Sequence, residues 1–524
     1  MARDNWGRLR GRAEHRAQLF AYYGRLPPRR DRADTLILPA RYSGGSTTSL
    51  AGASPPPQRR SISPGPGTVP SVSSAEAEAE ALTKALTEAE AEALAAAWAR
   101  AFAHVVDRTH LATGDELSAI VDDAVRPLGL RTVVLVADLA QQVLTPLTAQ
   151  AASALSVDGT LAGRCYQTGQ IIAGGDPEQR VLWVPILDGT ERVGVMRADL
   201  PDPACTDPAT HGDPDEQTQH VARGGGAPLV ATDGPELRRW LWSLAGMTGH
   251  VVMTKLVYSD RLRRIRSNGP LSPASELLWQ LLPPRTFATD NVVVAALLEP
   301  HDQVAGDAYD YNSDGRWVDL AVFDGVGHDL PAGLTTAVAI TAIRNARRSE
   351  ETDLLALAAR ADELLTTTPG AQLFVTAALA RLDTTTGRLR YLLAGHPPPL
   401  LVREGHVVKE LAAPPRPPLG IHASGDSGPG GLVAEEQLQP GDRLLLYTDG
   451  ITEARDAAGE FFGEQRLVEL TERTAADRLP APETLRRLSR AVLEHQGGKL
   501  QDDATLLLVE WSSTAKQTVL PSSI

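Results

Sequence analysis

Apolar runs of strand length alternate with helix-like segments over the C-terminal half of the chain. The runs "NVVVAALLE", "WVDLAVFD", "RLRYLLAG", "DRLLLYTD" and "DATLLLVEW" indicate strands, and "DTTTG" and "REG" indicate hairpin turns between neighbouring runs. Helical periodicity occupies about 331–347, 352–367, 464–476 and 484–495. Contiguous strands with helices in pairs are typical of an α+β fold, so we expect helices packed over a mainly antiparallel pair of sheets.

The preceding part of the chain has a different pattern. Residues 75–109 are rich in strong helix formers and predict one helix. Over 110–258, helix and strand patterns alternate around the segment "GTLAGRCYQTGQII", which predicts an α/β domain. A helical linker over 259–284 follows, and its last helix is expected to end at Pro283 and Pro284.

Both ends of the chain lack such periodicity. Residues 1–74 are rich in Pro, Ser and Gly and predict a disordered tail, and residues 513–524 predict a short second tail. Twelve Arg against four acidic residues make residues 1–60 basic. Two interpretations stay open for this segment: a loose tail, or an arm for a membrane surface or an acidic partner.

Composition narrows the class of protein. The chain has 524 residues and a formal net charge of −14, which disfavours general attraction to nucleic acid or anionic membranes. Two cysteines are too few for a disulfide framework, and a reducing cytoplasm fits best. The most apolar helical stretch, 240–258, is interrupted by His250 and Lys255, so we expect no membrane span.

Four aspartates stand where apolar strands meet loops: Asp307, Asp324, Asp449 and Asp502. If those strand ends gather at one edge, the carboxylates repel one another and their pKa values rise. A divalent cation removes that cost, and ligands that are all oxygen favour Mg²⁺ or Mn²⁺. Gly325 directly follows Asp324, and its main-chain carbonyl is a further candidate ligand.

These aspartates lie in a series of motifs that occur in order over about 274–511. They are "LLWQLLPP", "VAGDAYDY", "FDGVGHDLPAGL", "FVTAALARLDTTTGRLRYLLAGHPPPLLV", "PPLGI", "LQPGDRLLLYTDGITEARDAAGEFFGEQRL" and "QDDATLLLVE". The series resembles the PPM-type serine/threonine phosphatases (protein phosphatase 2C superfamily) in their bacterial SpoIIE-like branch. The resemblance implies a β-sandwich flanked by helices over 285–512, and hydrolysis of phosphoserine or phosphothreonine.

The same resemblance assigns roles to the candidate residues. It implies two Mn²⁺ or Mg²⁺ ions, with Asp324 bridging both and the Gly325 carbonyl binding one. Asp307 is expected to bind the first ion or its waters, and Asp449 and Asp502 the second. Asp324 and Asp449 are the expected catalytic residues, since paired metals lower the pKa of a bridging water and generate hydroxide near neutral pH.

Three nearby residues are left with open roles. Asp329 departs from the Gly-His-Gly of many members, and either alters metal affinity or caps the following helix. His328 is either a general acid or a structural residue. Asp503 is expected to support the ligands rather than to bind metal.

The segment 110–258 resembles a GAF sensory domain, which implies an unknown small ligand and regulation of the phosphatase. Within it, Cys165 is expected to be a core residue. The implied substrate is a phosphorylated anti-anti-sigma (STAS) protein acting in trans, and a homodimer is a further expectation. Two alternatives stay open: a degenerate phosphatase fold that only binds its partner, and a hydrolase of small phosphate metabolites.

Overall fold

The computed structural model describes residues 72–148, 153–174, 180–201, 233–267, 273–300, 306–327, 330–367, 374–421 and 432–521. The chain divides into a unit Met1–Ala75 and a unit Glu76–Ile524. Nearly all of the predicted N-terminal tail lies outside the described residues. The long helix α2, Val72–Thr109, begins three residues before the predicted start at residue 75.

The region after α2 contains one antiparallel sheet of strand order β3-β2-β1-β6-β5-β4. Its strands are β1 Arg131–Ala137, β2 Val143–Pro146, β3 Leu155–Ser156, β4 Ile172–Gly174, β5 Val181–Asp188 and β6 Glu191–Asp199. Its helices are α3 Leu117–Val125, followed by the short η1 Arg126–Leu128, then α4 Leu161–Thr168, α6 Pro235–Leu256 and α7 Asp260–Ser267.

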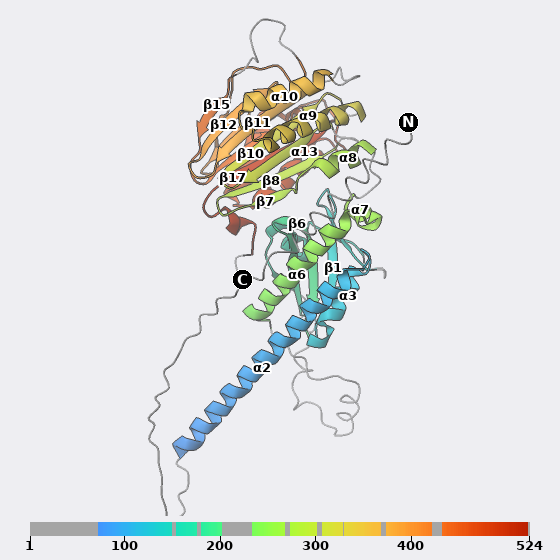
Figure 1. Ribbon diagram of the computed structural model, residues 1–524, viewed down its shortest axis with the longest axis vertical. Helices are drawn as coiled ribbons and strands as arrows, with labels where there is room; N and C mark the ends of the chain where they lie inside the picture. The colour runs from blue at the N-terminus through green and yellow to red at the C-terminus, as the bar shows by residue number, and fades with distance from the viewer. Residues whose placement is uncertain are drawn as a thin grey trace, which may run out of the picture. The chain divides into compact units, whose positions relative to one another are not determined.

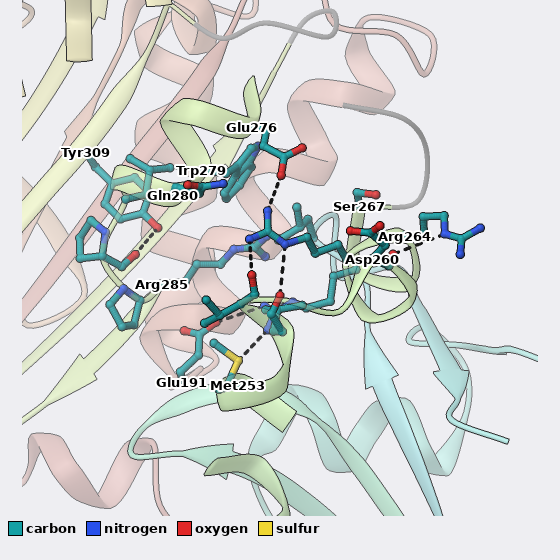
Figure 2. A pocket seen from close by; sticks show the side chains of 18 residues that line it. Glu191, Met253, Asp260, Arg264, Ser267, Glu276, Trp279, Gln280, Arg285 and Tyr309 are labelled. Carbon is teal, nitrogen blue, oxygen red and sulfur yellow. Dashed lines mark hydrogen bonds and ion pairs between the residues drawn. The ribbon is translucent and has the colours of Figure 1, made fainter. Parts of the chain in front are cut away.

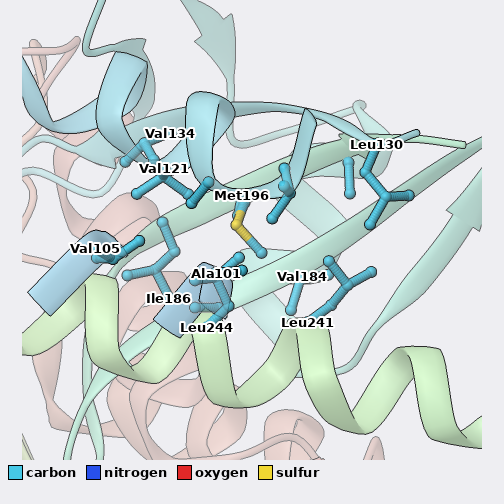
Figure 3. Close-up of a cluster of buried hydrophobic side chains, with 14 of the residues drawn as sticks. Ala101, Val105, Val121, Leu130, Val134, Val184, Ile186, Met196, Leu241 and Leu244 are labelled. Atoms are coloured by element: carbon cyan, nitrogen blue, oxygen red, sulfur yellow. The ribbon is translucent and has the colours of Figure 1, made fainter. Parts of the chain in front are cut away.

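The core of this region is formed where α2, α3 and α6 cover one face of the sheet. Figure 3 shows Leu241 and Leu244 of α6 pointing toward Val184 and Ile186 of β5, with Met196 of β6 between them. These residues are fully buried because the apolar face of an amphipathic helix gains most when it covers apolar strand residues. Cys165 lies in the smaller core on the other face, fully buried, as expected.

The C-terminal region contains two antiparallel sheets. One has the order β15-β12-β11-β10-β9 and the other β14-β13-β16-β17-β8-β7. The first consists of β9 Ala308–Asp314, β10 Trp317–Gly325, β11 Val375–Asp383, β12 Arg388–Ala394 and β15 Ala434–Gln437. The second consists of β7 Thr286–Ala288, β8 Val292–Glu299, β13 Leu400–Arg403, β14 His406–Glu410, β16 Asp442–Tyr447 and β17 Ala504–Trp511.

Strand β10 explains why the central strands are apolar on both faces. Its residues Leu320 and Val322 belong to the core between the two sheets, whereas Ala321 and Phe323 face the core under α9 and α10. Successive strand residues point to opposite faces, so a strand buried on both sides is a continuous apolar run.

Helices cover the outer faces of both sheets. Helices α9 Leu330–Arg348 and α10 Leu354–Thr367 lie across the sheet that contains β10, β11 and β12 (Figure 1). Over the other sheet lie α11 Asp449–Thr452, α12 Gly463–Ala476 and α13 Ala481–His495; α8 Pro273–Leu281 and the short η3 Ala515–Thr518 complete the region. The predicted α+β architecture is confirmed.

Several local predictions differ from the structure. Helix α6 ends two residues before the predicted boundary at residue 258, and the exposed residues Val257 and Tyr258 separate it from α7. The polar strands β9 and β15 were not predicted. The GAF resemblance of 110–258 stays a prediction, although the region does combine helices with an antiparallel sheet. Among the described helices, none has the length and apolarity that crossing a bilayer requires.

Candidate active site

The strand register brings the candidate aspartates together in two pairs. Asp307 immediately precedes β9, and Asp324 lies near the end of its antiparallel neighbour β10, where Phe323 pairs with Ala308. In the other sheet Asp449 follows β16 and Asp502 precedes β17, and Tyr447 pairs with Leu506. The end of one antiparallel strand lies beside the start of the next, so each sheet presents two carboxylates at one edge.

The electrostatics show that the two pairs face each other. Burial, and then Asp449 and Asp502 of the other sheet, raises the pKa of Asp324 to about 7. Burial, and then Asp324, raises the pKa of Asp307 well above its usual value. The pKa of Asp449 is raised by burial, then by Glu453 and Asp502. The four predicted aspartates therefore form one repulsive cluster.

Glycines allow the main chain to pack tightly beside this cluster. A Cβ atom on Gly306 would lie 2.4 Å from the Gly327 carbonyl oxygen and 2.6 Å from the Gly325 carbonyl oxygen. The Gly306 carbonyl accepts hydrogen bonds from the Gly325 amide at 3.1 Å and the Thr336 hydroxyl at 2.6 Å. A side chain at Gly306 would clash with these carbonyls. Glycine at this position therefore allows the Gly325 carbonyl to lie close to residue 306, next to Asp307 of the cluster.

Buried hydrogen bonds tie the two sheets together behind the aspartates. Asp503, which is 3% exposed, accepts a hydrogen bond from the Gly306 amide at 2.5 Å. The Thr448 hydroxyl donates to Asp307 at 2.7 Å and accepts from the Thr505 amide at 3.0 Å. That Asp503 supports the metal ligands stays a prediction, and the role of Thr448 was not predicted.

A second supporting chain reaches Asp324. The Thr376 hydroxyl of β11 donates to Asp324 at 3.5 Å and lies 2.8 Å from Nδ1 of His396. His396 is 6% exposed, and burial lowers its pKa to about 4, so the ring is neutral near pH 7. Neither residue was predicted, although His396 belongs to the quoted motif "AGHPPP".

Comparison with known proteins bears on this region. Residues 313–512 match the family model of Stage II sporulation protein E (SpoIIE). They therefore form a SpoIIE-type domain.

Two curated relatives and one solved structure are similar to part of the chain. Protein IcfG of Synechocystis sp. is 31% identical over 139 residues, which are 26% of this chain and 20% of IcfG. Phosphoserine phosphatase RsbU of Bacillus subtilis is 26% identical over 240 residues, 45% of this chain and 68% of RsbU. The SiaA-PP2C domain of Pseudomonas aeruginosa is 26% identical, with a TM-score of 0.39 over 46% of this chain and 94% of that domain.

The similarity is limited to part of each protein. The chain spans about a fifth of IcfG and about two thirds of RsbU. The predicted resemblance to SpoIIE-like phosphatases is confirmed for residues 313–512, while the resemblance of residues 110–258 to GAF domains stays a prediction.

The side chains of the aspartate cluster are chemically suited to bind a divalent metal ion. Carboxylates that repel one another, next to a main-chain carbonyl, are hard oxygen donors that a cation would stabilise. In the described parts of the chain, however, no three His, Cys, Asp or Glu side chains are grouped so that they could hold one ion. The ligand assignments therefore stay predictions. His328 and Asp329 lie outside the described residues, and their roles are untested.

Proposed function

We propose that this chain is a metal-dependent protein serine/threonine phosphatase that hydrolyses phosphoserine or phosphothreonine on a regulatory partner. The observation that carries the proposal is the cluster of Asp307, Asp324, Asp449 and Asp502 at strand ends. The last three of these lie within the residues that match the SpoIIE family model, and Asp307 lies six residues before them. The name of RsbU, a phosphoserine phosphatase, supports the same activity.

In this proposal Asp307, Asp324, the Gly325 carbonyl, Asp449 and Asp502 hold two Mn²⁺ or Mg²⁺ ions. When bound, such ions supply an activated water and neutralise the phosphoryl oxygens. The protein's own contribution is to fix the donors in place. Thr448 orients Asp307, Thr376 contacts Asp324, and burial keeps both carboxylates poorly hydrated.

The raised pKa values describe how these donors respond to a cation. Without a bound cation, Asp324 is half protonated near pH 7. Asp307 keeps its proton to a higher pH than an ordinary aspartate, because its pKa is also raised. A cation that takes their oxygens must displace these protons, so metal affinity is expected to rise with pH over this range.

The substrate and the regulation are finer parts of the proposal. The substrate is a phosphorylated anti-anti-sigma (STAS) protein supplied in trans, and the chain acts in the cytoplasm as the predicted homodimer. Residues 110–258 act as a GAF-like sensory domain for a small ligand. The similarity to RsbU, which is named a phosphoserine phosphatase, supports a phosphoserine substrate.

A direct test incubates the full chain with a STAS protein phosphorylated on serine, with and without Mn²⁺, and measures released phosphate. We expect release only with Mn²⁺, and its loss in Asp324→Asn and Asp449→Asn. Equal release by wild type and both variants would refute the assignment of these residues.

The alternative is a binding protein that sequesters the partner without turnover. Titration with Mn²⁺ separates the two, because a sequestering protein binds its partner without metal and releases no phosphate. A panel of small phosphate esters tests the third possibility, a metabolite phosphatase.

A further inference from the structure

A cavity of about 810 Å³ lies outside the aspartate cluster, within the unit Glu76–Ile524. Its walls come from the segment after β1 and from β6, α6 and α7 on one side, and from α8, the segment before β7 and β9 on the other. Its volume is within the range of about 300–1,000 Å³ that is typical of small-molecule sites. The cavity therefore has room for a ligand of moderate size.

Most of the wall is apolar. Met253 and Leu256 of α6, Trp279 of α8 and the segment from Leu282 to Pro284 contribute apolar surface. Figure 2 shows Trp279 and Tyr309 on the α8 side of the cavity and Met253 on the opposite side. A flat or aliphatic molecular body is the complement of such walls.

The charged part of the wall has an excess of guanidinium groups. Arg263 is paired with Glu276 at the rim, and Arg266 lies 3.6 Å from Glu191 in the interior. Arg264 lies on α7, and its Nε donates to the main-chain carbonyl of Asp260 on the same helix. The fourth arginine, Arg285, is 8% exposed and extends toward the middle of the lining side chains in Figure 2.

Arg285 lacks the partner that a buried charge requires. Among the described residues its guanidinium makes no ion pair, its Nη2 has no hydrogen-bond acceptor, and its recorded contact is the Trp279 ring at 5.3 Å. Burial, opposed by Arg285 itself, raises the pKa of the nearby Glu299 carboxyl to about 7. Glu299 is thus only partly ionised near neutral pH, and it does not fully neutralise Arg285. Buried guanidinium groups are normally paired with an anion.

We propose that this cavity binds a small organic anion, with its acidic group on Arg285 and its apolar body against Trp279, Met253 and Leu256. The site is formed only in part by residues 110–258, for which an unknown small ligand was expected. It does not depend on the proposed phosphatase activity.

The test uses two fluorescent probes of nearly the same shape, one of which is anionic and the other neutral. 1-Anilinonaphthalene-8-sulfonate carries one sulfonate, and N-phenyl-1-naphthylamine is its neutral counterpart. Each is titrated into the full chain, first as wild type and then as Arg285→Met. We expect saturable binding of both probes, and a fall of about tenfold in the affinity ratio of anionic to neutral probe in the variant, equal to about 1.4 kcal/mol. An unchanged ratio would overturn the role of Arg285.

A second variant keeps the test decisive if Arg285→Met fails to fold. Gln280 is an exposed lining residue of α8, and Gln280→Trp narrows the cavity without changing any charge. We expect this variant to bind both probes at least about fivefold more weakly, because the lost cavity volume removes contacts to the aromatic rings of either probe. Wild-type affinity in Gln280→Trp would overturn the site. The matched control is Arg360→Met, which removes an exposed arginine of α10 and should leave both affinities unchanged.

Discussion

At Asp324 the needs of stability and of chemistry conflict. Its pKa of about 7 lies above the usual 3.8, so between these values the folded state binds more protons than the unfolded state. The free energy of unfolding of the metal-free protein therefore falls as pH rises from about 4 to 7. The protein retains at this position a carboxylate that destabilises its own fold, which is typical of functional sites.

Replacing Asp324 by Asn should remove that penalty. In EDTA at pH 8 we expect Asp324→Asn to raise the free energy of unfolding by up to about 4 kcal/mol, while phosphate release is lost. At pH 4 the gain should vanish. Urea unfolding at both pH values measures this. A variant less stable than wild type at pH 8 would contradict the repulsive cluster.

Asp383→Asn is a control of opposite sign. Its carboxyl has a lowered pKa, chiefly because Arg316 donates hydrogen bonds to it. A lowered pKa adds stability above the unfolded value that is lost as the pH falls. This variant should therefore be less stable than wild type at pH 8.

Thr376 and His396 are expected to act as positioning residues for Asp324. Thr376→Val keeps the volume but removes the hydroxyl between the two. Loss of such support typically costs about 10–100-fold in metal affinity or activity, so the Mn²⁺ concentration for half-maximal activity should rise. Because His396 is neutral near pH 7, its titration should add no step to the pH profile between 6 and 8.

The control for this prediction is Thr341→Val on α9, whose hydroxyl donates only to main-chain carbonyls of its own helix. It should leave the Mn²⁺ requirement unchanged. If Thr376→Val behaves like this control, Thr376 has no positioning role.

Among the helices and strands, those that are buried were the ones that the sequence predicted best. Strand β10 was predicted closely because it is buried on both faces, and its residues 320–323 form a continuous apolar run. Strand β9, Ala308–Asp314, was missed because its C-terminal half is polar. Its strand conformation depends on pairing with β10, which the local sequence does not reveal. Periodicity alone also could not locate the break at Val257 and Tyr258, since both flanking segments are good helix formers.

Strand β9 is held to α9 by a buried charge cluster. Asp310, which is 1% exposed, accepts hydrogen bonds from Arg344 at 2.6 Å and Arg347 at 2.6 Å. Asp310→Ala leaves two largely buried guanidinium groups without their carboxylate, a change that typically costs about 3–5 kcal/mol. Denaturant unfolding measures the loss.

The exposed pair Arg360–Glu363 on α10 supplies the comparison. Glu363→Ala should cost no more than about 0.5 kcal/mol, because solvent screens surface ion pairs. Equal losses in the two variants would show that the Asp310 cluster does not hold β9 to α9.

At the scale of the whole molecule, the site depends on contacts that no local pattern reveals. The bond from Gly306 to Asp503 joins residues 197 positions apart, and that from Thr448 to Asp307 spans 141 positions. Asp324, Asp449 and Asp502 could be predicted because each adjoins an apolar strand, whereas Asp307 precedes the polar strand β9 and was recognised within the motif "VAGDAYDY". Thr448, Thr376 and His396 could not, because only the folded sheets bring them to their partners.

One further long-range contact yields a prediction about cooperativity. Asp158, just before α4, accepts hydrogen bonds from Arg486 of α13, one of them at 2.8 Å, and pairs with Arg490 of the same helix. Asp158→Arg places three like charges together and should weaken the coupling between residues 72–267 and 273–521. In calorimetry we expect the unfolding transition to broaden or split, with its first midpoint lowered by several degrees, about 1 kcal/mol.

Asp199→Arg is the matched control, since Asp199 is similarly exposed (36% against 37%) but pairs with Arg197 of its own strand. Splitting in both variants, or in neither, would mean that the Asp158 contact does not couple the two parts of the chain.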